Sequence, residues 1–503
     1  MLTTGVAPLR GDFICVRIIS INSQAPATYA TRESSGSLQL APGDPIRVDR
    51  VRGEGEAVMT DTRDMAHPRA EDAVGNRRQL RRVYFASLIG TTVEFYDFIV
   101  FGVAASLVFG QVFFESTSES LGTILSFAIL AIGYAARPLG GIIFGHFGDR
   151  VGRKSTLLWT MILMGLSTFL IGCLPSSAQI GALAPILLVT LRLIQGIAVG
   201  GEWGGAVLMA VEHAPKKSRG FFGGAASLGS GAGVLLAYGA FALLNNLDDE
   251  AFLTWGWRLP FLFSVVVVGV GLYVRLRVEE SPVFESEQHS SEATEKPPIP
   301  LIEVFRERPG KVLLGIGTVS GTFMSQAIVS TFLISYAATH YGLHRSTLLT
   351  LLNVSLVIMI FTIPFFSFIS DKVGRRQIFI PAAVGYAVFA FVMFPMVGSG
   401  SPLIILATFI IGMAILNSAA TGTSATLLSE LFPTKFRYTG AGVAYQFAGL
   451  IGGGIGPLLA SIFVAPGGIG PIGVSIMLAA FCTLSAICAY RIGDNRTVDL
   501  SDA

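Results

Sequence analysis

Five ionisable residues lie within long apolar stretches of the sequence, where a charge in lipid is costly and usually functional. They are Glu94, Asp97, Arg137, Arg192 and Glu202. Glu94 and Asp97 stand at positions i and i+3, so their carboxylates share one face of a helix. Two neighbouring carboxylates repel each other when both are charged, so one of them binds a proton more readily than an isolated carboxylate does. A guanidinium group, in turn, binds anions. We expect Glu94, Asp97 and Glu202 to couple protons to a solute bound by Arg137 and Arg192.

The same charges have a structural interpretation. Arg137 and Arg192 could only neutralise the carboxylates and hold the helices together, and Glu202 could be the partner of an arginine instead of a coupling acid. Both interpretations stay open at the level of sequence.

Neutral residues supply further candidates for substrate contacts. The central parts of the last six apolar segments contain no clear Asp, Glu, Lys or Arg, so that half must contact a solute through polar and aromatic groups. For each candidate, helix packing is the structural alternative. Together with the two arginines, the candidates from both halves are Tyr96, Gln195, Tyr336, Asn417, Tyr445 and Gln446.

Composition indicates which elements position these residues. Apolar types make up 52% of the chain and charged types 14%, and the mean hydropathy is +0.64, as for a chain whose surroundings are mostly lipid. A spanning helix needs about 20 apolar residues. The sequence predicts an all-α membrane protein with twelve spans, at 83–113, 121–144, 155–174, 183–211, 220–245, 258–276, 312–339, 347–369, 377–397, 402–428, 438–464 and 471–490.

The loops between these spans alternate in charge. Lys and Arg gather before the first span, in every second loop and after the last span. This distribution places both termini in the cytoplasm. We expect residues 1–82, which hold no spanning run, to be a disordered extension, with Met59 and Met65 as alternatives to Met1 for its start. Two six-helix halves, 83–276 and 312–490, are then joined by a cytoplasmic linker at 277–311 and followed by a tail at 491–503.

Two cytoplasmic loop patterns occur in both halves at nearly the same offset, which indicates a duplication. We expect these loops to act as latches between moving helices, through carboxylates at helix ends and arginine–carboxylate pairs. In the first half the gate residues are Gly145, Asp149, Arg150, Gly152, Arg153, Lys154, Glu212 and Arg219; in the second they are Asp371, Gly374, Arg375, Arg376, Glu430 and Arg437.

The loop at residues 145–154 is similar to the signature of the major facilitator superfamily. Five further stretches resemble the metabolite:proton symporters of that superfamily, which carry shikimate, 2-oxoglutarate, citrate or proline and betaine. They are Val93–Phe98, Arg137–Gly141, Arg192–Glu202, Trp255–Phe261 and Glu279–Phe284.

This resemblance implies the major facilitator fold and proton-driven uptake of a small organic acid or zwitterion by alternating access. We expect a bacterial cytoplasmic membrane protein that works as a monomer with the proton gradient and no cofactor, and that binds no nucleic acid.

Other functions fit the sequence less well. A sugar:proton symporter is the nearest alternative, but the tail lacks the run typical of sugar carriers. A channel needs no buried acid pair, and a sensor usually adds a signalling domain. The six histidines are scattered without metal-ligand spacing, and no phosphate-binding loop is present, which argues against an enzyme, a metal site and direct use of ATP.

Overall fold

The computed structural model describes most of the chain beyond residue 69. The described residues are 70–151, 153–200, 218–244, 247–276, 304, 306–432 and 434–493, with five short strands nearer the N-terminus. For the strands and for 70–83, 145–155, 157, 249, 275 and 434–438 only the backbone is described. The chain forms two compact units, Met1–Asn76 and Arg77–Ala503.

In the first unit the described strands form two small antiparallel sheets. One has the order β1 (Gly5–Val6), β2 (Val16–Ile18) and β3 (Thr28–Ala30), and the other pairs β4 (Arg47–Val48) with β5 (Met59–Thr60). Residues 70–82 belong to helix α1, and the expectation of disorder stays a prediction for the undescribed residues before it.

In the second unit the described elements are all helical, since in lipid a helix satisfies its backbone hydrogen bonds internally. The first half contains α1 (Ala70–Leu107), α2 (Phe109–Phe113), α3 (Glu119–Val151), α4 (Arg153–Gly172), α5 (Ser177–Ile180), α6 (Leu183–Gly200), α8 (Arg219–Ala242), α9 (Asp249–Ala251), the π-helical η3 (Phe252–Gly256) and α10 (Arg258–Leu276).

The second half continues from the expected linker, of which the structure describes only a few residues. It contains α13 (Pro309–Ala327), η4 (Ile328–Phe332), α14 (Leu333–Tyr341), α15 (Arg345–Val373), α16 (Arg375–Gly398), α17 (Pro402–Phe409), η5 (Ile410–Asn417), α18 (Ser418–Ser429), α19 (Thr434–Gly449), η6 (Leu450–Ile455), α20 (Gly456–Val464) and α21 (Pro471–Ile492).

All twelve expected spans coincide with helices. Eleven helices in the described part of the chain are long and apolar enough to cross a membrane, and the twelfth, α4, has a shorter apolar part at Leu158–Gly172. In the fourth span only Leu183–Gly200 is described. The first helix begins at Ala70, before the expected residue 83.

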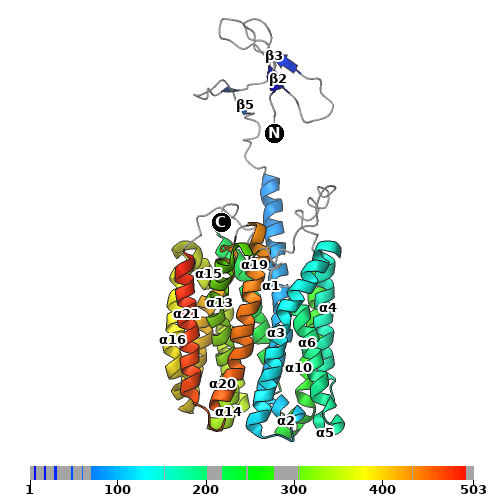
Figure 1. Cartoon of the computed structure of the whole chain (residues 1–503), viewed down its shortest axis with the longest axis vertical. Coiled ribbons are helices and arrows are strands. Elements are labelled where there is room, and N and C mark those ends of the chain that lie inside the picture. Colours follow the sequence, from blue (N-terminus) through cyan, green and yellow to red (C-terminus); the bar gives the residue numbers. More distant parts are fainter. Residues whose placement is uncertain are drawn as a thin grey trace. The chain divides into compact units, whose positions relative to one another are not determined.

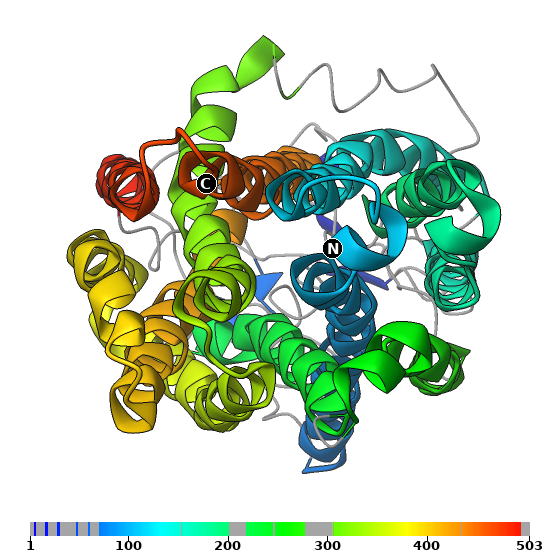
Figure 2. The ribbon, with the colours of Figure 1, turned by 90° about the horizontal axis from the view of Figure 1, so that it is seen from below.

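The helices of each half lie together. Seen from below, those of the first half, blue to green, occupy one side, and those of the second half, yellow-green to red, occupy the other (Figure 2). The end of α21 lies at the same end of the bundle as the cytoplasmic start of α1, while α2, α5 and α14 lie at the opposite end (Figure 1).

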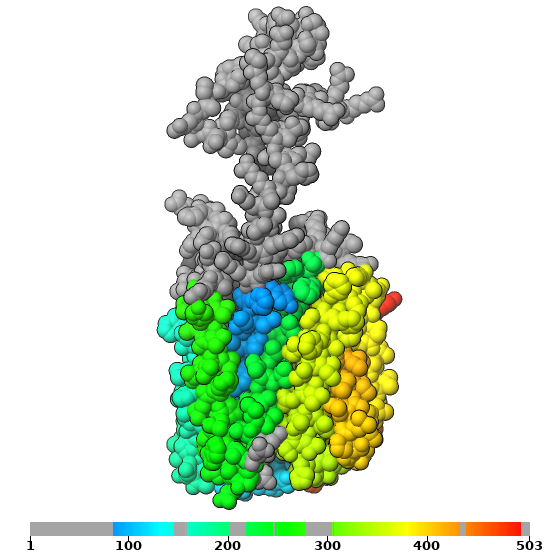
Figure 3. Space-filling view, turned by 180° about the vertical axis from the view of Figure 1, so that it is seen from behind, coloured from blue at the N-terminus to red at the C-terminus, as the bar shows by residue number. Residues whose placement is uncertain are grey.

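Two sets of helix contacts join the halves. In one, α8 of the first half packs along α15 and α18; in the other, α3 packs along α19, η6 and α20. Figure 3 shows the green surface of the first half meeting the yellow-green surface of the second along the bundle. A methyl group added at Gly452 or Gly453 would lie 2.3 Å from the Ser320 carbonyl oxygen or 2.6 Å from the Tyr134 ring. The glycine run in η6 therefore permits close packing.

Three spans of the second half widen into π-helical segments in their central parts, namely η4, η5 and η6. Such segments interrupt the regular ladder of helix hydrogen bonds and are frequent at functional sites. Two of them contact the first half: Tyr238 of α8 donates to the Ser330 carbonyl oxygen of η4, and η6 packs on α3.

Candidate functional site

Glycines bring α3 and α6 into backbone contact. A Cβ added at Gly140 would lie 1.8 Å from the Ile197 carbonyl oxygen, and one at Gly200 would lie 1.9 Å from the Arg137 carbonyl oxygen. At Gly133 an added Cβ would lie 2.1 Å from the Arg192 Nε atom. Only glycine leaves room there, so the close approach of these helices creates the space that holds the Arg192 side chain.

The Arg192 guanidinium is fully buried and oriented by Gln195. Its Nη1 donates to Gln195 Oε1 at 2.5 Å, while Gln195 Nε2 donates to Thr168 Oγ1 at 2.7 Å and to the Asp97 carbonyl oxygen at 3.2 Å. Among the described residues, Nε and Nη2 of Arg192 have no hydrogen-bond partner. Gln195 thus ties α6 to α4 and α1, which gives this predicted substrate contact a positioning role.

Phe98 of α1 contacts both arginines. The guanidinium carbons of Arg137 and Arg192 each lie 3.8 Å from the centroid of its ring. Arg137 also lies 4.6 Å from the Tyr134 ring centroid, and Arg192 lies 4.1 Å from that of Phe101. A desolvated cation–π contact contributes about 2 kcal/mol. These five residues, which we call the arginine cluster, hold two positive charges together inside the membrane.

The acid pair lies on α1 beside this cluster. Glu94 is 1% exposed and Asp97 is fully buried. Glu94 precedes Phe98 by one helical turn and so lies on the face of α1 that meets the arginines. Burial at this depth was expected, whereas the roles of the two carboxylates in proton coupling stay predictions.

Two small cavities lie between the halves. One of about 20 Å3, the arginine cavity, is lined by Phe95, Phe98, Ile99, Gly102, Leu130, Tyr134, Arg137, Phe323, Gln326, Ala327, Ser330, Thr331 and Gly453. The other, of about 30 Å3, is the hydroxyl cavity, lined by Phe95, Ala226, Ser227, Ser230, Val319, Thr322, Phe323, Gln326, Thr421, Ser424, Ala425 and Tyr445. They share Phe95, Phe323 and Gln326, so they are neighbours at the centre of the bundle.

Of the predicted substrate contacts in this site, Arg137 and Tyr445 line a cavity. Asn417 lies behind the hydroxyl cavity, where its Oδ1 accepts from Thr421 Oγ1 at 3.1 Å and its Nδ2 lies 3.5 Å from the Thr322 carbonyl oxygen. Its amide thereby supports two residues of the lining.

The remaining predicted contacts lie elsewhere. Tyr96 is fully buried and donates to the Pro260 carbonyl oxygen at 2.7 Å, which joins α1 to α10. Gln446 donates to the Gly200 carbonyl oxygen at 3.3 Å, across the two halves. Tyr336 stacks on His340 with ring centroids 4.3 Å apart. In these contacts the three side chains join helices or pack in an aromatic cluster outside both cavities.

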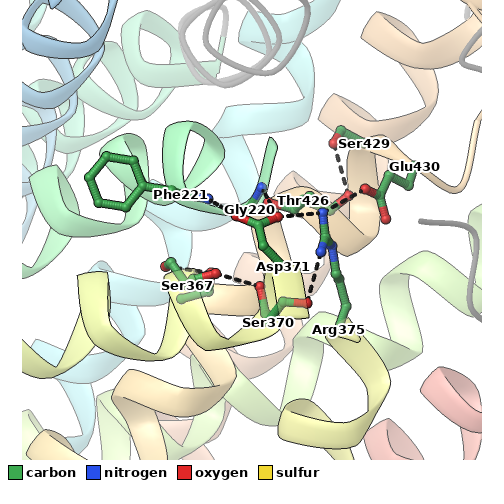
Figure 4. A network of polar contacts seen from close by, with 10 residues as sticks. Gly220, Phe221, Ser367, Ser370, Asp371, Arg375, Thr426, Ser429 and Glu430 are labelled. Atoms are coloured by element: carbon green, nitrogen blue, oxygen red, sulfur yellow. Dashed lines mark hydrogen bonds and ion pairs between the residues drawn. The ribbon is translucent and has the colours of Figure 1, made fainter. Parts of the chain in front are cut away.

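A second polar site, the cytoplasmic latch, joins the halves at one end of α8. Asp371 of α15 accepts from the backbone N–H groups of Gly220 at 2.8 Å and Phe221 at 3.0 Å, in the first turn of α8 (Figure 4). Arg375 lies 3.0 Å from Asp371 and 3.2 Å from Glu430, and it donates to the Ser370 carbonyl oxygen at 2.9 Å. A carboxylate at a helix N-terminus is stabilised by the helix dipole.

Three of the predicted gate residues, all from the second half, are thus brought together. Asp371, Arg375 and Glu430 form the latch (Figure 4), Gly374 has the left-handed φ of 112° between α15 and α16, and Arg376 lies over the Tyr490 ring instead. Arg219 starts α8 beside the latch and is buried. The side chains of the other gate residues, and all of Glu202, lie outside the described residues: Gly145, Asp149, Arg150, Gly152, Arg153, Lys154, Glu212 and Arg437.

Sequence reasoning missed several side chains of the site. Phe98 follows the predicted acid Asp97 directly and contacts both predicted arginines, but an apolar ring is not a titratable or hydrogen-bonding group. Gln326 is one of several amides in the apolar spans. A usable signal was present for Gln326, because a lone amide in an apolar span is costly without a partner. For Gly133 no signal distinguished it from the other glycines.

Known proteins identify the family. The Major Facilitator Superfamily model matches residues 87–457 and 322–499. The shikimate transporter of Escherichia coli K12 is 40% identical over 432 residues, 85% of this chain and 98% of that protein. The inner membrane metabolite transport protein YhjE of that strain is 40% identical over 388 residues, 76% of this chain and 87% of that protein.

Among solved structures, the proton:xylose symporter XylE, bound to 6-bromo-6-deoxy-D-glucose, has a TM-score of 0.68 and 18% identity, over 85% of this chain and 98% of that one. This likeness concerns the fold, and it confirms the expected twelve-helix architecture. The chain therefore belongs to the major facilitator superfamily, and it is a multi-pass transporter of small metabolites in the cytoplasmic membrane.

Proposed function

We propose that this transporter is a symporter that imports a small organic acid together with protons. The observation that carries this proposal is the position of Arg137, which is buried, lies over the Phe98 ring in the arginine cluster and lines a cavity between the halves. A carboxylate that enters this cavity gains a charge-assisted hydrogen bond. The similarity to a shikimate transporter supports an organic acid as the substrate.

The acid pair supplies the coupling in this scheme. Protonation of Glu94 or Asp97 removes a negative charge beside two guanidinium groups, so the cluster becomes more attractive to a substrate anion. Substrate and proton then favour the same state of the carrier. Because the gradient is the energy source, we propose that the carrier needs no cofactor. We also propose that it works as a monomer, since both halves that line the cavities belong to one chain.

A zwitterion fits the arginine cavity less well than an anion. Recognition of a quaternary ammonium usually relies on open aromatic rings. Of the four aromatic rings that line the arginine cavity, those of Phe98 and Tyr134 are already covered by the Arg137 guanidinium, which leaves Phe95 and Phe323. A cationic group there would meet a second positive charge.

Alternating access requires contacts that close each end in turn. The latch at Asp371 closes the cytoplasmic end, while towards the opposite end Tyr238 donates to the Ser330 carbonyl oxygen of the other half and lies 3.1 Å from Thr331 Oγ1. With both contacts formed, the central cavities hold only water-sized volumes. We propose that import proceeds by breaking these two contacts alternately.

Uptake into proteoliposomes tests the proposal. Labelled shikimate, 2-oxoglutarate, citrate, proline, betaine and a hexose are offered with and without an inward proton gradient. We expect the gradient to stimulate uptake of an organic acid, and a proton ionophore to remove the stimulation. If protons stimulate none of the solutes, or only the hexose, the proposal is wrong.

A variant pair tests the role of the arginine. Arg137→Gln should reduce gradient-driven uptake by about 100-fold, since a charge-assisted bond to the substrate is lost. The control is Arg491→Gln, an exposed arginine at the end of α21. Equal uptake by both variants would remove Arg137 from the site.

A further inference from the structure

The hydroxyl cavity has a different chemistry from the arginine cavity. Its polar side chains come from both halves and are neutral: Ser227 and Ser230 on α8, Thr322 and Gln326 on α13, Thr421 and Ser424 on α18, and Tyr445 on α19. Their hydroxyl and amide groups can each donate and accept hydrogen bonds. A substrate group in this cavity is therefore expected to be a neutral hydrogen-bonding group.

Gln326 stands where the two cavities meet. It is 9% exposed and lines both of them. No hydrogen bond to a described residue satisfies its side-chain amide. The amide lines both cavities, so water or a transported solute there can supply its hydrogen bonds. An amide in this position is suited to a hydroxyl group.

The two cavities together contain a single formal charge. Among the described residues that line them, Arg137 is the only one with a side chain of the charged or titratable types Asp, Glu, Lys, Arg and His. A second carboxylate on the substrate would lie among hydroxyls, Phe323 and Ala425 without a cation to pair with. A substrate ammonium group would find no lining carboxylate there. The charge of the lining thus matches one carboxylate.

The hydroxyl cavity can open as the halves separate. Ser227 Oγ donates to the Thr421 carbonyl oxygen at 2.8 Å, and this bond crosses from α8 to α18. Parting of these helices would widen the cavity beyond its water-sized volume and release the Ser227 hydroxyl together with a carbonyl acceptor. Both groups would then be available to hydroxyls of a solute.

We propose that the transported solute is a hydroxylated monocarboxylic acid, whose carboxylate binds Arg137 and whose hydroxyls bind Gln326 and the hydroxyl cavity. This proposal rests on the proposed function, because it assigns the substrate of the same site. It excludes dicarboxylates, tricarboxylates and betaines as preferred substrates. It also assigns specificity to Gln326, since a site that hydrogen-bonds a substrate hydroxyl discriminates strongly against analogues without it.

Matched pairs of probes test this assignment in proteoliposomes with an inward proton gradient. Shikimate is compared with cyclohex-1-ene-1-carboxylate, which has the same ring without hydroxyls, and gluconate with hexanoate; 2-oxoglutarate, citrate and betaine complete the set. We expect the hydroxylated member of at least one pair to be taken up about 100-fold better than its counterpart, and better than the other three solutes. Equal uptake within both pairs, or preference for a di- or tricarboxylate or betaine, overturns the proposal.

Variants locate the discrimination. Gln326→Leu should reduce the preference for the hydroxylated probe about tenfold and leave uptake of its counterpart unchanged. Gln377→Leu, at an exposed amide of α16, is the control. Thr322→Val is a second test, with Thr408→Val as its control, because the buried Thr408 hydroxyl bonds only to the Ile404 carbonyl oxygen of its own span. Unfolding is followed by thermal melting in detergent.

These outcomes are distinct from failure of the proposed function. If the gradient drives a dicarboxylate, the carrier is a proton symporter with a different substrate. If the gradient drives none of these acids, the proposed symport of an organic acid with protons is refuted. A preference for hydroxylated probes that neither Gln326→Leu nor Thr322→Val reduces would overturn the assignment of hydroxyl recognition to Gln326 and the hydroxyl cavity.

Discussion

The two halves of the molecule keep their charges at different depths. In the first half Glu94, Asp97, Arg137 and Arg192 are buried in the middle of the spans. In the described part of the second half the corresponding depth holds amides and hydroxyls, and the buried ion pairs lie at the cytoplasmic end, around Arg375. Duplication therefore preserved the backbone architecture while the buried charges separated, at the middle of the spans in one half and at their cytoplasmic end in the other.

The largest expected effect tests whether coupling belongs to the first half alone. Asp97→Asn keeps the volume of the side chain and removes its charge, so we expect accumulation against a gradient to be lost while substrate exchange continues. The measurement is uptake with an imposed pH gradient beside counterflow in its absence. Glu119→Gln, at an exposed acid on α3, is the control. A variant that still concentrates substrate would break the comparison between the halves.

A smaller effect is expected from the packing that holds Arg192. Gly133→Ala places a methyl group against the Arg192 Nε atom, at a position 2.1 Å away if nothing moves. Overpacking of this kind costs about 1–3 kcal/mol, and the guanidinium must leave the Phe98 ring. Thermal melting and uptake should both fall.

The control for this substitution is Gly269→Ala on α10. A methyl group there meets nothing within 4 Å, so no loss is expected. If both glycine variants behave alike, the arginine cluster does not depend on the close approach of α3 and α6.

The smallest expected effect concerns closure in the second half. Asp371→Asn keeps an acceptor at the start of α8 but removes the charge that complements the helix dipole and Arg375. We expect the cytoplasmic closed state to lose about 1–2 kcal/mol, roughly a tenfold shift towards opening. The rate at which a maleimide added from the cytoplasmic side labels a cysteine introduced at Ser227 measures this shift. Unchanged labelling would show that α8 and α15 stay together without the latch.

The sequence predicted the fold more fully than the site. Span positions and sidedness depend on hydropathy and on Lys and Arg in the loops, which act locally. Buried charges such as Arg137 and Asp97 were also visible, because they are rare in spans. What sequence could not supply was the pairing between helices: that Gln195 orients Arg192, that Tyr96 bonds to Pro260, or that Gly133 makes room for a guanidinium.

The same limit explains why Gln326 was not selected. Its neighbours in the cavities come from α1, α3, α8, α18, α19 and η6 as well as from its own span, and these elements are far apart along the chain. Tyr336 was a candidate on the same grounds, yet it packs among Phe332, His340 and Phe394. Polarity in an apolar span indicates that a residue needs a partner, but only the tertiary arrangement decides whether the partner is protein or solute.

The latch has a consequence for how this chain can tolerate change over evolution. Asp371 binds main-chain amides, so a different side chain at position 221 leaves its partner intact, with proline as the exception because proline has no N–H. Position 220 is more constrained, since any Cβ there would lie 2.7 Å from the Asp371 carboxylate. Substitutions at Phe221 should therefore accumulate without any compensating change at Asp371, whereas any side chain at position 220 requires Asp371 and Ser370 to move.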